Sequence, residues 1–149
     1  RSSLVGSEMC IRDSNNYLNK ELVPVHSLKS VIAQIINCKK GESVGYNRSF
    51  ICKNDMMVGV IPIGHADGIS RSFSKNAHVF ISGKKAKVLG NICMDVLMIN
   101  LNGINCNEGD EVVVFDSKNN AEDFAKSVGT ISYEILTNLS SRIERKIIR

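Results

Sequence analysis

The chain is cut into short apolar runs by frequent turn residues, and this punctuation limits its fold more than any other feature. Runs rich in Val and Ile alternate with turn pairs such as Ser82-Gly83 and Asn102-Gly103. Runs bounded by Gly and Asn in this way are typical of strands joined by tight connections. We therefore expect a mainly β chain whose strands form an antiparallel sheet or a barrel.

The individual strands follow from the apolar content of each run. Residues 56–63 are apolar at both odd and even positions, which predicts a strand that is buried on both faces and ends at Pro62. Ser82-Gly83 has the spacing of a two-residue hairpin turn. The other segments for which we expect extended structure are residues 23–38, 43–50, 77–81, 84–89, 92–101, 111–115 and 143–148.

Helical spacing is confined to two stretches late in the chain, residues 121–128 and 132–139. In the second, Ser132 is placed as an N-cap and Glu134 lies in the first turn, where a carboxylate is favourable. Both stretches are short. The expected fold class is therefore mainly β: an antiparallel, barrel-like sheet with two short helices.

Composition excludes several classes of protein. No segment of the 149 residues approaches the roughly 18 consecutive apolar residues that a membrane-spanning helix needs. The net charge of +4 comes from 19 basic and 15 acidic residues scattered along the chain. Aromatic residues make up 5% and Trp is absent, which leaves few side chains to stack on bases. We expect neither a membrane nor a nucleic acid as partner.

The cysteines indicate a reducing environment. There are 5 of them, an odd number, and no two form a C-x-x-C pair. This spacing suits neither a disulfide framework nor a zinc site. We expect reduced thiols, no bound metal and a cytoplasmic location.

The first residues differ from the rest of the chain. Residues 1–14 have no hydrophobic period and lack the apolar run of a secretory signal. The string at 3–14 resembles the translated read-through of a sequencing adaptor. We therefore expect residues 1–14 to be non-native and residues 15–149 to be one β-domain, entered abruptly as in a truncated reading frame.

Four short strings carry the most specific signal, and their order and spacing matter as much as their letters. They are VGY at 44–46, IPIGHADG at 61–68, GNICMD at 90–95 and TISYE at 130–134. Together they resemble the C-terminal domain of alanine racemases, over a stretch from about residue 28 to the C-terminus.

The resemblance implies an activity and a partner. In that family an N-terminal (β/α)8 barrel holds pyridoxal phosphate on a lysine, and the C-terminal β-domain completes the active site of the other subunit. The parent protein is thus expected to be a cytoplasmic homodimer that interconverts L-alanine and D-alanine for peptidoglycan. A barrel of about 250 residues does not fit in this chain, so the chain alone is expected to be inactive.

The resemblance also assigns residues. Tyr46 matches the base on the L-alanine face, and the backbone N–H of Met94, between Cys93 and Asp95, matches a contact to the substrate carboxylate. Tyr133 matches the tyrosine that holds the cofactor phosphate. Without the resemblance, Tyr46 is an ordinary strand aromatic, residues 93–95 are a strand with an acid at its edge, and Tyr133 packs the last helix.

Four further positions match the substrate channel of the family. Arg71 and Ile131 agree with its middle layer, whereas Asn91 replaces an arginine there, and His65 replaces a tyrosine at the inner mouth. Imidazole is smaller than phenol and titrates near neutral pH, so channel width and pH response are expected to differ. Asp67, in the same string as His65, is typical of turn chemistry.

Tyrosine needs help to act as a base. Because the reference pKa of a phenol is ~10, its phenolate is ~4 kcal/mol less stable than the neutral phenol at pH 7. A nearby cation therefore has to favour the charged form. The family supplies an arginine from the barrel. If residues 43–50 form a strand, Arg48 shares a face with Tyr46 and adds positive potential.

Two other functions remain open from the residues alone. The net positive charge and the strand-rich pattern also suit an independent basic β-barrel that binds RNA or a protein. A scaffold without any ligand is the third reading. Fold class by itself does not choose among them.

Overall fold

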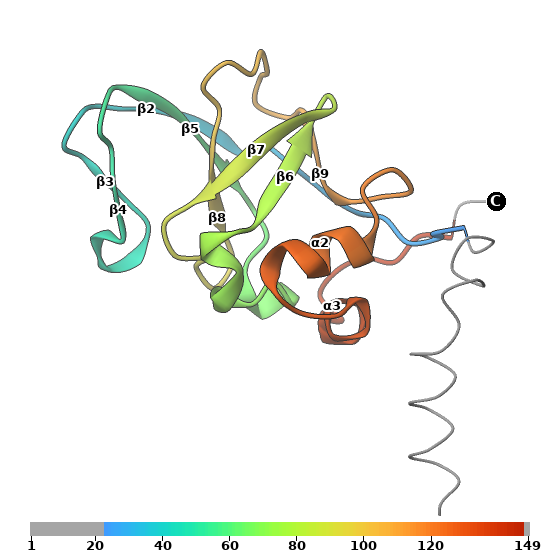
Figure 1. The fold of residues 1–149 in the computed structure, drawn as a ribbon. Coiled ribbons are helices and arrows are strands. Elements are labelled where there is room, and N and C mark those ends of the chain that lie inside the picture. The colour runs from blue at the N-terminus through green and yellow to red at the C-terminus, as the bar shows by residue number, and fades with distance from the viewer. Residues whose placement is uncertain (1–22, 148–149) are drawn as a thin grey trace, which may run out of the picture.

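A computed structural model describes residues 23–147 and shows a strongly curled antiparallel sheet with two helices beside it (Figure 1). The sheet has 7 strands in the order β1-β9-β6-β7-β8-β5-β2, and β3 and β4 form a separate pair. The mainly β fold class is confirmed. The strands are β1 Leu28–Val31, β2 Gln34–Cys38, β3 Ser43–Val44, β4 Phe50–Ile51, β5 Met56–Ile61, β6 His78–Ile81, β7 Lys84–Leu89, β8 Leu97–Asn100 and β9 Glu111–Phe115. The helices are α2 Ala121–Val128 and α3 Ser132–Asn138, with short 3-10 helices η2 Tyr46–Arg48, η3 His65–Asp67 and η4 Arg71–Lys75.

One segment supplies both edges of the sheet, because β1 and β2 are separated only by Ile32 and Ala33. The Ile32 N–H donates to the Asp110 carbonyl at 3.0 Å, and the Ala33 N–H donates to the Val60 carbonyl at 2.9 Å. The strand expected over residues 23–38 is therefore shorter and divided in two. β1 lies at one edge of the sheet and β2 at the other, so this segment brings the two edges together and closes the curl. Closure protects edges that would otherwise be open to pairing with other chains.

The expected hairpin between β6 and β7 is confirmed. Ser82 and Gly83 have φ values of 48° and 76°, and positive φ at both central residues is the requirement of a type I′ turn. The turn brings His78 opposite Lys87 and Phe80 opposite Lys85. The segment 77–81 thus forms a strand, although its first residue lies outside it.

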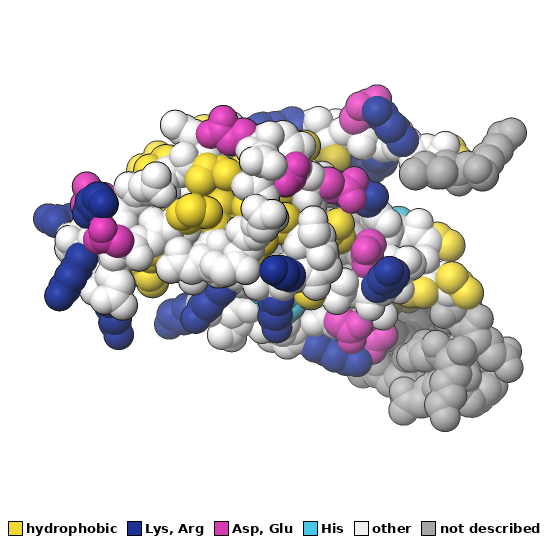
Figure 2. All heavy atoms as spheres, turned by 90° about the horizontal axis from the view of Figure 1, so that it is seen from above, with side chains coloured by type: hydrophobic (Ala, Val, Ile, Leu, Met, Phe, Trp, Pro, Cys, Tyr) yellow, Lys and Arg dark blue, Asp and Glu magenta, His cyan; other side chains and the backbone are white. Residues whose placement is uncertain are grey.

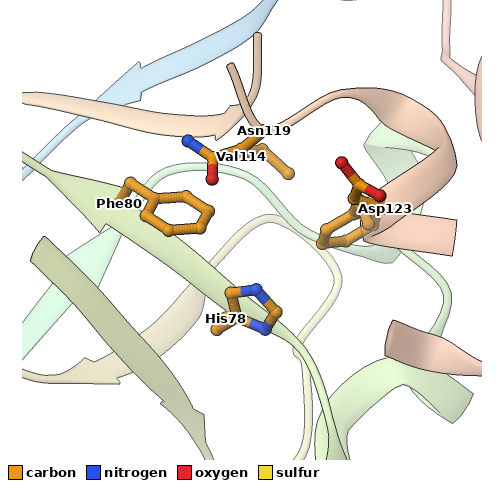
Figure 3. A pocket seen from close by; sticks show the side chains of 6 residues that line it. His78, Phe80, Val114, Asn119 and Asp123 are labelled. Carbon is orange, nitrogen blue, oxygen red and sulfur yellow. The ribbon is translucent and has the colours of Figure 1, made fainter. Parts of the chain in front are cut away.

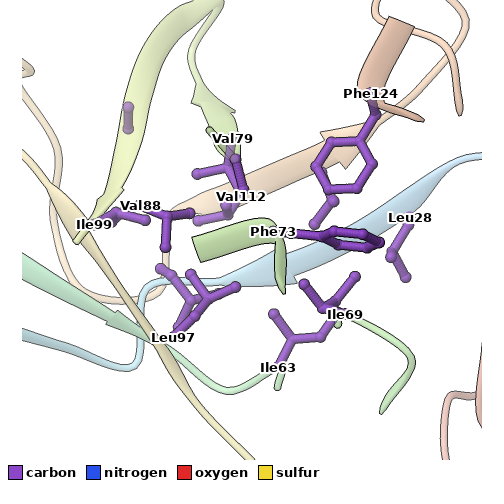
Figure 4. Packing of buried hydrophobic residues seen from close by; sticks show 14 of the residues in the cluster. Leu28, Ile63, Ile69, Phe73, Val79, Val88, Leu97, Ile99, Val112 and Phe124 are labelled. Carbon is purple, nitrogen blue, oxygen red and sulfur yellow. The ribbon is translucent and has the colours of Figure 1, made fainter. Parts of the chain in front are cut away.

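The hydrophobic core fills the inside of the curl and extends under the helices (Figure 4). Val79 and Ile81 alternate inward on β6, as do Ala86 and Val88 on β7. Such alternation is what a sheet with one buried face requires. Helix α2 caps one end of this core, where the ring centroids of Phe124 and of Phe73 from η4 lie 6.1 Å apart at an interplanar angle of 86°. Edge-to-face contacts of this kind are a favoured aromatic geometry.

Two expected strands are shorter than their apolar content indicated. Residues 92–101 contain only β8, because the Ile92 and Cys93 N–H groups donate to Ser74 Oγ and to the Val96 carbonyl instead of a neighbouring strand. Residues 43–50 contain β3, the start of β4 and, between them, η2, where Asn47 and Arg48 have φ of 60° and 50°. The prediction that Tyr46 and Arg48 share a strand face is therefore wrong.

The end of the chain also differs from expectation. Helix α2 has the expected bounds, capped by Asn120 and Gly129. In α3 the N-cap residue is Ile131 and not Ser132, and it makes no side-chain cap. Residues 143–147 form no strand. The proposed adaptor segment, residues 1–14, lies outside the described residues. Within the described part, no helix has the length and apolarity to cross a bilayer.

Candidate functional site

Tyr46 stands on a projecting arm, which we call the Tyr46 arm and define as residues 43–51. Its side chain is 64% exposed. Figure 1 shows β3 and β4 extending away from the main sheet, on the side opposite the helices. The base of the arm covers a second, smaller core of buried side chains. These are Val44, Cys52, Val58 and Leu89.

Two glycines let the arm lie against the chain that follows β7. A Cβ on Gly45 would lie 3.1 Å from the Asn91 nitrogen, and one on Gly90 would lie 2.7 Å from the Val44 carbonyl oxygen. Both glycines have positive φ, 80° and 63°, a region that residues with a Cβ avoid. The close backbone approach therefore depends on the absence of side chains at both positions.

Asn91 ties the arm down by two hydrogen bonds. Its backbone N–H donates to Ser49 Oγ at 2.8 Å, and its side-chain Nδ2 donates to the Tyr46 carbonyl at 3.3 Å. Asn91 was expected as a channel residue. Its contacts are structural, because they hold the backbone that presents the Tyr46 ring.

The next residues along the chain form a loop, residues 93–95, which we call the Met94 loop. The Cys93 carbonyl accepts a hydrogen bond from the His65 N–H, and the Met94 carbonyl accepts one from the Ala66 N–H, both at 2.9 Å. The Met94 side chain is 55% exposed. Within the described residues, the Met94 N–H donates to no acceptor.

Gly64 is required for this contact between η3 and the Met94 loop. Any Cβ at Gly64 would overlap the carbonyl groups of Cys93 and Met94. The His65 side chain remains exposed. The structure thus places His65 next to the Met94 loop through the backbone.

Arg71 reaches the same region through Ser74. Ser74 Oγ donates to the Arg71 carbonyl at 2.7 Å and accepts from the Ile92 N–H at 3.0 Å. Helix η4 is therefore fixed to the start of the Met94 loop. The expected site residues that hydrogen bonds link into one region are Tyr46, His65, Arg71, Asn91, Cys93 and Met94. Asp95 follows them directly in the Met94 loop.

Tyr133 and Ile131 lie elsewhere. Both are at the N-terminal end of α3, with exposed fractions of 60% and 47%. In Figure 1, α3 lies below the sheet and well away from β3 and β4. One copy of the chain therefore presents the Tyr46 and Tyr133 phenols at separate places. The two phenols thus come from elements at different places in the fold.

Sequence reasoning missed Arg142, which bridges two carboxylates of this region. Its Nη1 lies 2.7 Å from Asp95 Oδ1 and its Nε lies 3.4 Å from Asp67 Oδ1. The carboxylate of Asp95 and then that of Asp67 raise the pKa of the guanidinium. An arginine after the last helix carries no periodic or motif signal, so only its spatial neighbours identify it.

Asp67 was expected to serve turn chemistry, and it does more than that. Its Oδ2 accepts the Gly64 N–H at 2.9 Å, as in a turn. The residue is also only 6% exposed and pairs with Arg142. Buried carboxylates need such partners because desolvation of a charge is costly.

A separate hollow of about 40 Å³ lies between β6, β9 and the start of α2 (Figure 3). Burial lowers the pKa of His78 at its wall. No expected site residue lines it. The lining residues are His78, Phe80, Val114, Asn119, Asp123 and Phe124.

The surface gives little support to an RNA-binding barrel. On the face shown in Figure 2, Lys and Arg side chains lie among Asp and Glu and form no continuous basic surface. Binding to a nucleic acid backbone needs clustered cations. The charge distribution on this face therefore does not favour that reading.

Comparison with known proteins agrees with the four sequence strings. The sequence profile of the family described as "Alanine racemase, C-terminal domain" matches residues 25–147. The chain is 41% identical over 128 residues to the alanine racemase of Helicobacter pylori strain G27, which covers 83% of this chain and 34% of that protein. It is 39% identical over 139 residues to alanine racemase 1 of Clostridium acetobutylicum, covering 90% and 36%.

Solved structures agree as well. An alanine racemase from Clostridium difficile 630 in complex with cycloserine has a TM-score of 0.76 and 37% identity, covering 82% of this chain and 33% of that one. The biosynthetic alanine racemase of Pseudomonas aeruginosa has a TM-score of 0.81 and 28% identity, covering 87% and 36%. The chain spans about a third of the length of the curated relatives that it matches. This chain belongs to the alanine racemase C-terminal domain family.

Proposed function

We propose that this chain is the C-terminal domain of a pyridoxal-phosphate-dependent alanine racemase, which supplies D-alanine for peptidoglycan. The observation that carries the proposal is the exposed Tyr46 ring, held on its arm beside an exposed Met94 loop in a chain of this family. The enzyme acts as a homodimer in the cytoplasm. The four cysteines of the described residues are unpaired, which suits a reducing compartment.

Racemisation needs two bases, because one proton leaves one face of the α-carbon and another arrives on the opposite face. Tyr46 Oη takes the proton on the L-alanine face of the partner subunit's site. A lysine of the barrel serves the opposite face. The phenolate needs a neighbouring cation, and since Arg48 does not share a strand face with Tyr46, we assign that cation to the barrel.

The residues present fit the cofactor. Tyr133, which is 60% exposed at the start of α3, carries a phenol, and the Met94 N–H donates to no acceptor within the described residues. Both are donor types suited to anionic oxygens. Tyr133 Oη would hold the phosphate, and the Met94 N–H would donate to the substrate carboxylate, with Cys93 and Asp95 shaping the loop. Pyridoxal phosphate, when bound, supplies the electron sink that makes the α-proton acidic.

The channel residues belong to the same proposal. Arg71, Ile131, Asn91 and His65 would line the approach of the amino acid. With Asn91 in place of an arginine, the channel attracts the substrate carboxylate less strongly. The His65→Tyr variant should narrow the inner mouth, because phenol is larger than imidazole. Asn91→Arg should lower the KM for alanine through its added cation and should also remove the Nδ2 bond to the Tyr46 carbonyl.

The test replaces the matching C-terminal part of Helicobacter pylori alanine racemase with this chain. We expect the chimera to racemise alanine, and Tyr46→Phe to reduce proton removal from L-alanine by about 10²- to 10⁴-fold. The cofactor absorbance should not change. Lys85→Ala, on the outer face of β7, is the matched surface control. Equal turnover of the Tyr46→Phe chimera and its parent in both directions would refute the role of Tyr46.

The isolated chain provides a second test. We expect it neither to retain pyridoxal phosphate after dialysis nor to racemise alanine, because the family's cofactor lysine belongs to the barrel. Adding a barrel-only protein of the relative should restore D-alanine formation. Activity of the chain by itself would contradict the division of roles proposed here.

A further inference from the structure

Backbone hydrogen bonds hold Cys93 and Met94 in the Met94 loop, and the Cys93 N–H also closes the loop on the Val96 carbonyl at 2.9 Å. His65 and Ala66 donate to the carbonyls of Cys93 and Met94. Within the described residues Asp95 makes no backbone hydrogen bond, and its side chain is held by the 2.7 Å ion pair with Arg142. The bond from the His65 N–H to the Cys93 carbonyl orients the planar peptide that carries the Met94 N–H, and the Asp95 ion pair restrains the residue that follows it.

The backbone of Arg142 is also held in this part of the fold. Its backbone N–H donates to Ser140 Oγ at 3.2 Å, and the Ser140 N–H donates to the Asp67 carbonyl at 3.2 Å. Gly68 lies so close to the carbonyl of Asn138 that it has no room for a Cβ. The segment after α3 is therefore packed onto η3, so the backbone that carries the Arg142 side chain is held in place.

The buried carboxylate of Asp67 orients the guanidinium of Arg142. Asp67 has a side chain only 8% exposed, and its Oδ1 lies 3.4 Å from Arg142 Nε. Asp95 is 47% exposed and lies on the outer side of the same guanidinium. A planar fork with several donors can hold two carboxylates at once, and an ammonium group cannot do so with the same geometry.

We propose that Arg142 is a positioning residue, which links the buried Asp67 to Asp95 and so holds the Met94 N–H where the substrate carboxylate binds. The inference rests on the proposed function of the Met94 loop. Arg142 touches neither substrate nor cofactor in this scheme. Its effect reaches the substrate only through Asp95 and the loop.

The kinetic test uses the chimera described above, with variants Arg142→Gln, Arg142→Lys and Asp95→Asn. Arg142→Gln should raise the KM for alanine about tenfold, the value of one charge-assisted hydrogen bond, with a much smaller change in kcat. Asp95→Asn should have a similar effect. The double variant should be no worse than either single one, because both changes break the same link.

The lysine variant separates positioning from stability. Arg142→Lys keeps a charge beside Asp67, so the thermal midpoint should recover while the KM stays raised. A variant Arg142→Gln that lowers the midpoint and leaves the KM unchanged would overturn the proposal, and so would full recovery of the KM by Lys.

Hydrogen exchange on the full chain distinguishes failure of the Arg142 proposal from failure of the proposed function. Loss of Arg142 should speed exchange of the Ala66 amide, which donates to Met94, and leave the Val88 amide, which donates to Ala77, unchanged. An inactive wild-type chimera refutes the proposed function. Unchanged exchange at Ala66 refutes the docking by Arg142, whatever the chimera does.

Discussion

The core inside the sheet and the Tyr46 arm are stabilised by different means. Core side chains such as Ile99 and Phe115 are fully buried and apolar, so their contribution grows with the area they remove from water. The arm has two strands of two residues each, an exposed tyrosine, and tethers through Ser49 and Asn91. The comparison teaches that apolar burial stabilises the scaffold, whereas glycines and polar contacts position the Tyr46 ring.

The largest expected effect lies in the core. Phe115→Ala should lower the free energy of unfolding by about 3 to 5 kcal/mol, because it removes a buried ring and leaves a cavity. Urea unfolding of the chain measures the loss. Ile51→Ala on the arm, at a side chain 55% exposed, should cost no more than about 0.5 kcal/mol. Equal losses at the two sites would remove the distinction between core and arm.

The second prediction concerns the junction between them. Gly90→Ala should destabilise the chain by more than about 2 kcal/mol, since its φ is 63° and its Cβ would lie 2.7 Å from the Val44 carbonyl oxygen. Gly83→Ala is the matched control, because its φ is 76° but the space around it is open. It should cost only the strain, about 1 to 2 kcal/mol. Equal costs in urea unfolding would show that the close approach is not limiting.

The third prediction tests the polar tether. Ser49→Ala removes the acceptor of the Asn91 N–H and should cost about 1 kcal/mol. Amide exchange at Asn91 should accelerate more than exchange in β6. Ser117→Ala, at an exposed serine, is the control. If Asn91 exchanges at the original rate, the arm is held by its small apolar cluster alone.

The smallest expected effect is the pH dependence at His78, on the side of the sheet away from the arm. Burial lowers its pKa, partly opposed by the Asn76 carbonyl. The unfolded chain therefore takes up the proton near pH 6.5, while the folded chain does so only at lower pH. The unfolding free energy should fall as the pH drops below about 6.5, and level off below the folded pKa.

The comparison for His78 is the variant His78→Gln, which cannot titrate. Urea unfolding from about pH 7.5 to pH 5 should show a steeper loss for the parent chain than for the variant. Parallel curves would mean that His78 does not contribute to the pH dependence.

The two regions also differ in how well their sequence predicted them. In the core, alternation and turn residues were sufficient, as the β6–β7 hairpin and helix α2 show. At the site, the strings named Tyr46 and Met94, but the strand expected around Tyr46 was wrong. The reason is a contact with Asn91, 42 positions or more along the chain, which no local pattern reveals.

Arg142 shows most clearly what the sequence could not predict. It is exposed and lies between an exposed serine, Ser141, and a half-buried isoleucine, Ile143, so the local pattern describes an ordinary surface arginine. Asp67 and Asp95 become its partners only after η3, the Met94 loop and the end of α3 have packed together. The site residues taken from the resemblance stay predictions until the kinetic tests are made.

The amino-acid sequence by itself determined the mainly β fold, the tight turns, the two helices and the family, because each depends on residues close together in the chain or on strings long enough to be specific. Tertiary structure alone decided how the Tyr46 arm bends, where the strand before Leu97 is interrupted, and that Arg142 bridges two carboxylates. Those features depend on hydrogen bonds and ion pairs between residues distant in sequence. The free-energy contribution of such contacts is set by burial and geometry and not by local propensity.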